Sequence, residues 1–151
     1  MNLNEGSVVL DAGCGYGRNS VLLSKLNLNV VAADFYCKSF SNSWFASYKN
    51  IHPIVLDCRK PLPFKSNSFS AVIVIHFYNE NLIENLVDLI KPSGFLIYES
   101  IGGNGENWRE LDVSGKVKTL LEKQFIISYY KERLVGPEKK YATVKVVAQK
   151  I

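Results

Sequence analysis

Glycine at every second position follows a short apolar run near the start of the chain. The segment 8–20 reads VVLDAGCGYGRNS, with glycine at positions 13, 15 and 17. A strand that turns sharply into a helix needs one glycine for its unusual backbone angles, whereas three alternating glycines keep Cβ atoms away from a longer stretch of backbone. The pattern therefore predicts a strand–loop–helix unit whose loop approaches a ligand, with the free N–H groups and positive dipole of the helix directed at it.

The spacing of these glycines differs from that of two common nucleotide-binding loops. The dinucleotide fingerprint is G-x-G-x-x-G, and here Arg18 occupies the place of the third glycine, one position after Gly17. The G-x-x-x-x-G-K-[ST] pattern of P-loops is absent as well. The loop therefore argues against NAD and against ATP held by a P-loop.

Strand-like and helix-like segments alternate along the chain. The expected strands cover residues 7–12, 29–34, 52–57, 69–77, 95–99, 125–134 and 141–150, and the expected helices cover residues 18–26, 38–49, 81–90 and 113–123. Residues 92–94 are expected to form a turn. Apolar strands separated by helices predict a parallel sheet covered on both faces, and the short last connection predicts an antiparallel pair. The fold class is thus α/β: a doubly wound, mostly parallel seven-stranded sheet with an antiparallel C-terminal strand pair, and ligands at the carboxyl ends of its strands.

Length and composition favour one globular domain over residues 1–151 in a reducing, cytoplasmic compartment. The longest apolar run, 71–75, is far shorter than the roughly 18 residues of a membrane-spanning helix, and no signal peptide is visible. Cys14, Cys37 and Cys58 form no CxxC pair, so neither a metal site nor a disulfide framework is expected. Only about six residues precede the first strand, so an N-terminal helix that covers the site is not expected.

The glycine loop resembles the first motif of the class I S-adenosylmethionine-dependent methyltransferases. In that family an acidic residue stands two positions before G-x-G-x-G, as Asp11 does in DAGCGYG. The resemblance implies a Rossmann-like methyltransferase fold, S-adenosyl-L-methionine as the cofactor, and a loop that wraps its methionine and ribose parts. The cofactor-binding residues implied in this loop are Asp11, Gly13, Cys14, Gly15 and Gly17.

The resemblance continues at the ends of later strands. Asp34, followed by Phe35, stands where the family has an acidic residue on the ribose hydroxyls, and one carboxylate can accept hydrogen bonds from both. Asp57 and Cys58 stand where an acidic side chain lies near the adenine amino group and the next backbone N–H contacts the ring. His76, at the end of the fourth expected strand, belongs to the implied cofactor site near the methyl group.

Other segments carry the resemblance across most of the chain, with two departures. PLPFKSNSFSAVIV and LIKPSGFLIYE resemble the family's approaches to its fourth and fifth strands, although Ser70 replaces a common aspartate and Ser93 a glycine. GCGYGRNS also resembles the tellurite-resistance-type branch of the family. The last three residues of this segment, Arg18, Asn19 and Ser20, are expected at the start of the helix. Ser20 is expected to cap the helix, and Arg18 either reaches an anion or faces solvent.

Methyl transfer from a sulfonium is an in-line displacement that depends mainly on positioning, and a general base is needed only where the acceptor must lose a proton. His76 and Tyr78 are the candidate catalytic residues, with Asn79 and Glu99 nearby; the alternatives are a structural histidine under the sheet edge and a pocket-shaping tyrosine. HFYN lacks the Asn/Asp-Pro-Pro-Tyr motif of enzymes that methylate amino groups of adenine or glutamine. The glycine-rich segment 101–110, with Trp108 and Arg109, is either a lid or a surface loop.

Charge leaves the nature of the acceptor open. The formal net charge is +4, but residues 1–115 carry 9 Lys or Arg against 11 Asp or Glu, whereas residues 116–151 carry 9 against 3. We expect a methyltransferase for a small-molecule or oxyanion-like acceptor. The alternatives are an RNA or protein acceptor held through the basic C-terminal third, which an uncovered site would suit, and a non-catalytic cofactor-binding subunit. A second subunit, in a homodimer or heterodimer, would also complete an uncovered site.

Overall fold

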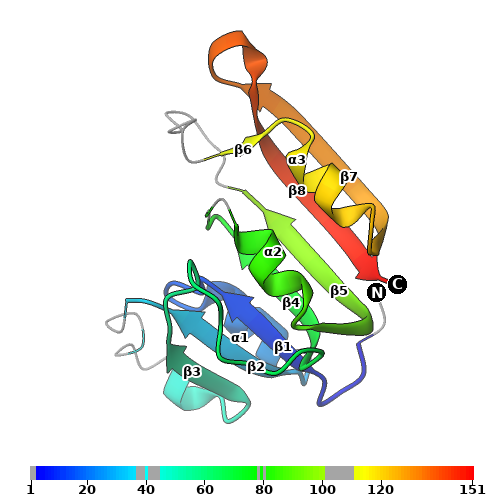
Figure 1. Cartoon of the computed structure of the whole chain (residues 1–151). Helices are drawn as coiled ribbons and strands as arrows, with labels where there is room; N and C mark the ends of the chain where they lie inside the picture. Colours follow the sequence, from blue (N-terminus) through cyan, green and yellow to red (C-terminus); the bar gives the residue numbers. More distant parts are fainter. Residues whose placement is uncertain (1–2, 37–39, 41–44, 78, 80, 101–110) are drawn as a thin grey trace.

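The fold is a twisted sheet with helices on both faces (Figure 1). The computed structural model describes residues 3–36, 40, 45–77, 79, 81–100 and 111–151. The strands are β1 Val8–Ala12, β2 Asn29–Asp34, β3 Ile51–Val55, β4 Phe69–Ile75, β5 Ile90–Glu99, β6 Asp112–Val113, β7 Phe125–Val135 and β8 Tyr141–Lys150. The α-helices are α1 Arg18–Ser24, α2 Leu82–Val87 and α3 Lys116–Leu121. None of these helices has the length and apolar character that crossing a lipid bilayer requires.

Strand order brings the carboxyl ends of the central strands to one edge of the sheet. The order is β3-β2-β1-β4-β5-β8, with the two-residue β6 beside the start of β8 and β7 along the other side of β8. The strands from β3 to β5 are parallel, and β8 runs antiparallel to both β5 and β7. The expected fold class is confirmed, and β6 makes the sheet eight-stranded rather than seven-stranded.

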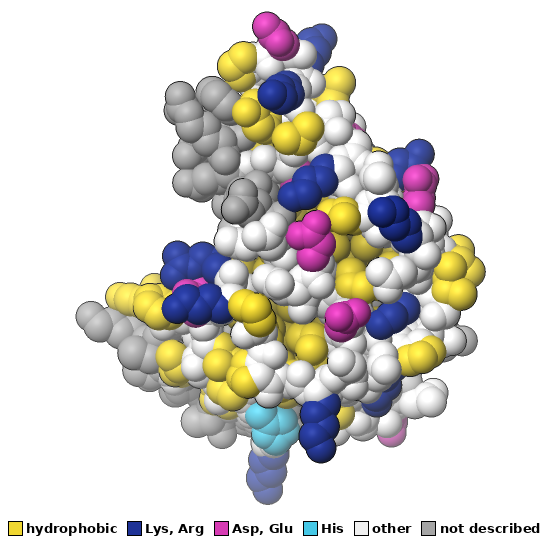
Figure 2. All heavy atoms as spheres, viewed as in Figure 1, with side chains coloured by type: hydrophobic (Ala, Val, Ile, Leu, Met, Phe, Trp, Pro, Cys, Tyr) yellow, Lys and Arg dark blue, Asp and Glu magenta, His cyan; other side chains and the backbone are white. Residues whose placement is uncertain are grey.

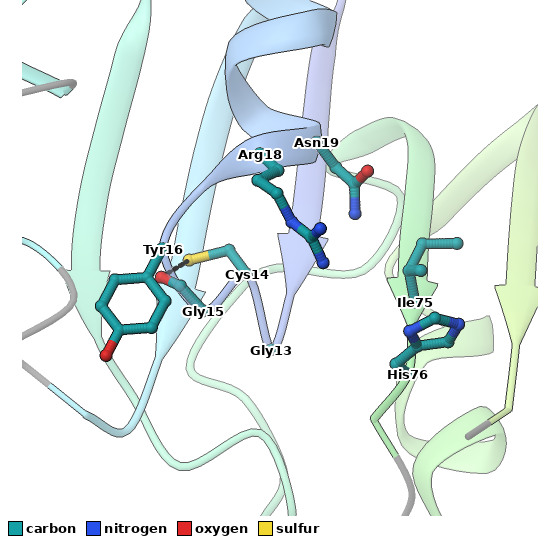
Figure 3. Close-up of a pocket in the computed structure, with 8 residues that line it drawn as sticks. All are labelled: Gly13, Cys14, Gly15, Tyr16, Arg18, Asn19, Ile75 and His76. Carbon is teal, nitrogen blue, oxygen red and sulfur yellow. Dashed lines mark hydrogen bonds between the residues drawn. The ribbon is translucent and has the colours of Figure 1, made fainter. Parts of the chain in front are cut away.

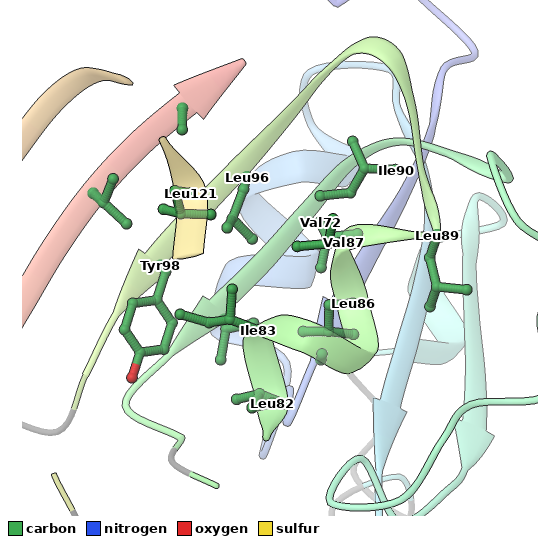
Figure 4. Packing of buried hydrophobic residues seen from close by; sticks show 14 of the residues in the cluster. Val72, Leu82, Ile83, Leu86, Val87, Leu89, Ile90, Leu96, Tyr98 and Leu121 are labelled. Carbon is green, nitrogen blue, oxygen red and sulfur yellow. The ribbon is translucent and has the colours of Figure 1, made fainter. Parts of the chain in front are cut away.

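Alternation of side chains along the strands supplies an apolar layer on each face of the sheet. On the face of α2 and α3, Leu10, Val72 and Leu96 pack among helix residues that include Leu86 and Leu121, all of them fully buried (Figure 4). Burying a leucine side chain of this kind stabilises a fold by about 1.5–3 kcal/mol. On the opposite face Val9, Leu28, Ala71 and Ile73 form a separate cluster beside α1. Figure 1 shows α2 and α3 in front of the sheet and α1 behind it.

Several expected elements begin or end elsewhere. The helices are shorter than expected, and Val113 of the last one belongs to β6. Of the expected helix 38–49, the structure describes a single 3₁₀ turn, Phe45–Ser47, and the residues 37–39 and 41–44 lie outside the described part. Apolar residues at helical spacing predicted the three α-helices but not the residue at which each of them ends.

The expected turn at residues 92–94 is wrong, because these residues lie inside β5, which starts at Ile90. The strand is irregular there: Phe69 pairs with Ile90, and the next pair of β4 and β5 is Ala71 with Phe95. Ser93 has a φ of 61°, and the backbone carbonyl of Ser93 accepts a hydrogen bond from Gln149 Nε2 at 3.0 Å. A bulge thus accommodates the Pro-Ser-Gly sequence within a continuous strand.

Replacing Ser93 by glycine is expected to stabilise the fold. A residue with a Cβ is disfavoured at a φ of 61°, and removing that strain contributes about 0.5–1 kcal/mol. Gly94→Ala is the opposite case, because a Cβ there would lie 2.8 Å from Ile90 Cγ2 and from the Lys91 carbonyl oxygen. Urea unfolding should show a higher free energy of unfolding for Ser93→Gly and a lower one for Gly94→Ala. Equal or lower stability of Ser93→Gly would contradict the strain at this bulge.

Candidate active site

The three glycines of the loop after β1 differ in what surrounds them. Gly13, Gly15 and Gly17 all have positive φ, at 71°, 53° and 78°. A Cβ on Gly13 would lie 2.8 Å from Phe77 Cγ, and one on Gly17 would overlap the ring of Phe45, so both positions are needed for packing. A Cβ on Gly15 would meet no atom within 4 Å. Gly15 is therefore the position where the absent side chain leaves space on the cavity side of the loop.

Asp34 at the end of β2 ties the loop to the neighbouring strand. Its Oδ2 accepts a hydrogen bond from the Gly15 backbone N–H at 2.8 Å, and its Oδ1 accepts one from the Tyr36 N–H at 2.8 Å. Each carboxylate oxygen can accept a further hydrogen bond. The side chain is thus held in place by the backbone while it keeps the capacity to bind two hydroxyl groups.

Two adjoining cavities meet at Gly13, on the carboxyl edge of the sheet. The smaller one, of about 300 Å³, is lined by residues that include Asp34, Phe35 and Cys58. The larger one, of about 450 Å³, is lined by the loop from Gly13 to Tyr16, by Arg18 and Asn19, and by Ile75 and His76 (Figure 3). Both volumes fall in the range of small-molecule sites. Every residue expected in the cofactor site except Asp11 and Gly17 lines one of these two cavities.

Asp57 lines the smaller cavity, but an unexpected partner holds it. Arg59 Nε lies 2.7 Å from Asp57 Oδ1 and a terminal guanidinium nitrogen lies 3.0 Å from Oδ2. The hydrogen bond from Arg59 lowers the pKa of Asp57. The same guanidinium lies 5.6 Å from the ring centroid of Phe35. The adenine contact of Asp57 stays a prediction, and Arg59, two residues further along the same loop, is a site residue that the sequence analysis missed.

His76 follows β4 with a φ of 57°, a conformation that non-glycine residues adopt mainly where the surroundings require it. Its Nε2 lies 3.1 Å from Glu99 Oε1, and Lys145 Nζ lies 2.7 Å from the same oxygen. Partial burial raises the pKa of Glu99, but the hydrogen bonds from Lys145 and His76 outweigh burial, and the pKa is lowered. The structure thus brings His76 and Glu99, both expected near the site, into contact. It also places Lys145 beside Glu99, a contact that follows from the register of β5 with β8 and not from the sequence.

Asp11 lies behind the loop and lines neither cavity. It is 1% exposed, and Ser20 Oγ donates a hydrogen bond to its Oδ2 at 2.5 Å. Burial raises its pKa to about 6. The expectation that Ser20 caps α1 is wrong, because Gly17 is the N-cap residue and the hydroxyl bonds Asp11 instead. Direct binding of cofactor by Asp11 stays a prediction, and the contact that the structure shows fixes the start of α1 against β1.

The two described cysteines are free thiols with little reactivity. Cys14 and Cys58 are buried, and burial raises both pKa values, that of Cys58 to about 11. A thiol with such a pKa is protonated near neutral pH and is a poor nucleophile. Their contribution is to the walls of the cavities, Cys14 in the larger and Cys58 in the smaller.

Several expected residues cannot be placed. Tyr78, Cys37, Trp108 and Arg109, with the whole segment 101–110, lie outside the described residues. Asn79 is described, and it organises the start of α2: its Oδ1 accepts from the Asn81 N–H at 3.2 Å. No group of His, Cys, Asp or Glu suited to a metal ion occurs among the described residues.

Asp11 is expected to make stability depend on pH. Its folded pKa of about 6 exceeds the ordinary 3.8, so the folded protein binds this proton more tightly than the unfolded chain does. Its contribution is therefore most favourable below about pH 4, falls by roughly 2–3 kcal/mol as the pH rises to 7, and levels off above the folded pKa. Urea unfolding at pH 4 to 7 should show this fall relative to Asp11→Asn, which can still accept from Ser20. Parallel pH profiles would contradict it.

Comparison with known proteins gives a consistent family. Residues 9–94, more than half of the chain, match the family described as "Methyltransferase domain". A comparison with curated protein sequences gives no match.

Three solved structures have the same fold at low sequence identity. A SAM-dependent methyltransferase from Methanosarcina mazei is 18% identical with a TM-score of 0.70, covering 99% of this chain and 94% of its own. An S-adenosylmethionine-dependent methyltransferase from Mesorhizobium loti is 16% identical with a TM-score of 0.74 and the same coverage. A TehB-like SAM-dependent methyltransferase from Corynebacterium glutamicum is 18% identical with a TM-score of 0.70, covering 99% of this chain and 83% of its own.

The fold, enzyme class and cofactor expected from the sequence are confirmed, while the tellurite-resistance-type branch stays a prediction. The chain belongs to the methyltransferase domain family, among the class I S-adenosylmethionine-dependent methyltransferases.

Proposed function

We propose that this chain methylates a small-molecule acceptor, and that His76 takes up the proton which the acceptor loses. The observation that carries the proposal is the junction of two cavities at Gly13, one beside Asp34 and the other beside His76. A nucleoside held at Asp34 and extended past Gly13 would direct its reactive end toward His76. The acceptor would then occupy the remaining part of the larger cavity.

The residues present fit the cofactor. Asp34 would bind the sugar hydroxyls, and the backbone from Gly13 to Gly15 would lie along the chain that joins the sugar to the amino acid. Phe35 and Cys58 would border the base. When bound, S-adenosylmethionine supplies a methyl group on a positively charged sulfur: the acceptor forms its new bond to carbon while the carbon–sulfur bond breaks and leaves its electron pair on sulfur.

Positioning is the main task of the protein in such a displacement. Holding donor and acceptor in line can lower the barrier by roughly 7–11 kcal/mol. His76 adds to this only for an acceptor that carries a proton at neutral pH, such as a hydroxyl compound, and a general base of this kind contributes about 10²–10⁴ in rate. An acceptor that is already an oxyanion needs no base, and Arg18 on the same cavity would favour it.

The distribution of basic residues favours a small acceptor over RNA or protein. Lys150, at the opposite edge of the sheet, donates to the carbonyls of Val87 and Ile90 at 2.9 and 2.8 Å, so it serves the fold. Lys145 is paired with Glu99. The face drawn in Figure 2 carries its lysines and arginines scattered among acidic and apolar side chains. A continuous basic track, which nucleic acid binding would require, is not visible on that face.

Label transfer tests the acceptor class. The chain is mixed with methyl-labelled cofactor and a cell extract divided into an ultrafiltrate, an RNA fraction and a protein fraction. We expect label in the ultrafiltrate. Label in RNA or protein would instead support the macromolecular alternative, and absence of label in every fraction, with cofactor binding intact, would support a non-catalytic cofactor-binding subunit.

His76→Ala is expected to lower turnover by about 10²-fold or more while cofactor affinity changes little, because the ring acts on the acceptor side. Single-turnover rates with the labelled fraction, together with calorimetry, separate the two effects. Unchanged turnover would remove His76 from the reaction and favour an oxyanion acceptor.

Asp34→Asn and Asp34→Ala are expected to weaken cofactor binding by about 10- to 100-fold, because each hydrogen bond to a charged group contributes roughly 1.5–3 kcal/mol. Asp88→Asn is the matched control: it removes the same charge from an exposed position at the C-terminal end of α2. Calorimetry that finds equal affinity in the Asp34 and Asp88 variants would contradict the ribose role.

A further inference from the structure

Three strands converge on one carboxylate oxygen beside the larger cavity. Ile75 at the end of β4 pairs with Glu99 of β5, and Glu99 pairs with Lys145 of β8. His76, the residue after β4, is held to β5 twice: its backbone N–H donates to the Glu99 carbonyl at 2.8 Å, and its Nε2 lies 3.1 Å from Glu99 Oε1. Lys145 Nζ reaches the same Oε1 at 2.7 Å. Strand pairing and the backbone hydrogen bond of His76 thus hold His76, Glu99 and Lys145 in fixed relative positions.

We propose that Glu99 and Lys145 are positioning residues that fix which nitrogen of His76 can accept a proton and set the pH range in which it does so. The proposal deepens the function proposed above and rests on it for its catalytic meaning. It concerns the proton of the acceptor alone: that proton passes to His76 and from there to water.

Glu99 determines the tautomer. An ionised carboxylate only accepts hydrogen bonds, so the contact at 3.1 Å requires the hydrogen of the neutral ring on Nε2. Nδ1 then carries the free electron pair. Figure 3 shows one ring nitrogen of His76 on the side of Arg18 and the glycine loop, and the other on the side away from them. With Nε2 occupied by Glu99, Nδ1 is the nitrogen that faces the cavity.

Lys145 balances the charge that Glu99 places beside the ring. A carboxylate alone would strongly favour the protonated imidazolium, which cannot act as a base. An ammonium group 2.7 Å from the shared oxygen keeps Glu99 ionised and offsets its field at the ring. Among the described residues, two further cations lie nearby: Arg18 of α1 lines the same cavity, and Lys131 of β7 lies opposite Lys145 in the register. Both add positive charge and act in the same direction as Lys145.

Nuclear magnetic resonance of the full chain tests this without an acceptor. The chain has two histidines, so His52→Asn assigns the signals of ¹⁵N-labelled His76. In the parent protein we expect the Nε2–H tautomer. Lys145→Met should move the titration midpoint of the His76 signals upward by about one pH unit, and Glu99→Gln should move it downward and mix the tautomers. Lys140→Met, which removes an exposed charge after the β7–β8 turn, is the control and should shift the midpoint far less.

An Nδ1–H tautomer in the parent protein, or equal midpoints in the Lys145, Glu99 and Lys140 variants, would overturn the proposal. A purely structural role of the cluster would leave the midpoint unmoved in any variant that still folds. If the midpoints move as expected while no fraction of the extract takes up label, the positioning of His76 stands and the proposed methyl transfer fails. If the midpoints move as expected and a fraction takes up label, turnover should be measured as a function of pH. The pH at which turnover falls off on the acid side should then shift with the His76 midpoint in Lys145→Met and Glu99→Gln.

Discussion

The hydrogen bond from the Gly15 N–H to the Asp34 carboxylate is the constraint on which the site depends. It joins the loop after β1 to the end of β2, and the Gly13 and Cys14 N–H groups strengthen the junction by donating to the Ala33 carbonyl at 2.8 and 3.0 Å. With the loop pinned in this way, the backbone at Gly15 faces open space rather than protein. The open space beside Gly15, where we propose that the nucleoside binds, thus arises from backbone geometry.

The parallel arrangement of the central strands brings the remaining site residues together. The ends of β1, β2 and β4 place the glycine loop, Asp34 and His76 along one edge, and β5 and β8 add Glu99 and Lys145. Most residues of the apolar layers that hold these strands lie away from the cavities, although Cys58 and Phe77 belong both to the core and to the wall of the smaller cavity. Asp11, which lies behind the loop, joins the start of α1 to β1 through its buried carboxylate.

Features of the fold that depend on the local residue pattern, such as strand bounds, could be predicted from the sequence. β2 and β8 have the expected bounds: β2 is an apolar run that begins at Asn29 and ends at Asp34, and β8 is rich in apolar and β-branched residues up to its end near Lys150. The turn expected at residues 92–94 is absent, since a Pro-Ser-Gly sequence that favours a turn in isolation is accommodated here as a bulge within β5. Arg59 and Lys145 were missed for another reason. Lys145 pairs with Glu99 across a strand register that spacing along the chain does not encode, and the pairing of Arg59 with Asp57, although only two residues apart, depends on how the loop turns.

A crystal structure of the full chain with S-adenosylhomocysteine bound is the most direct test of the central claim. The account predicts the sugar hydroxyls on the Asp34 carboxylate, the amino acid part along the glycine loop beside Gly15, and the sulfur on the side of the cavity that His76 borders. It also predicts that the Gly15–Asp34 hydrogen bond is retained, because the ligand uses the remaining electron pairs of that carboxylate. A nucleoside bound elsewhere, or a loop that must break away from Asp34 to admit it, would contradict the account.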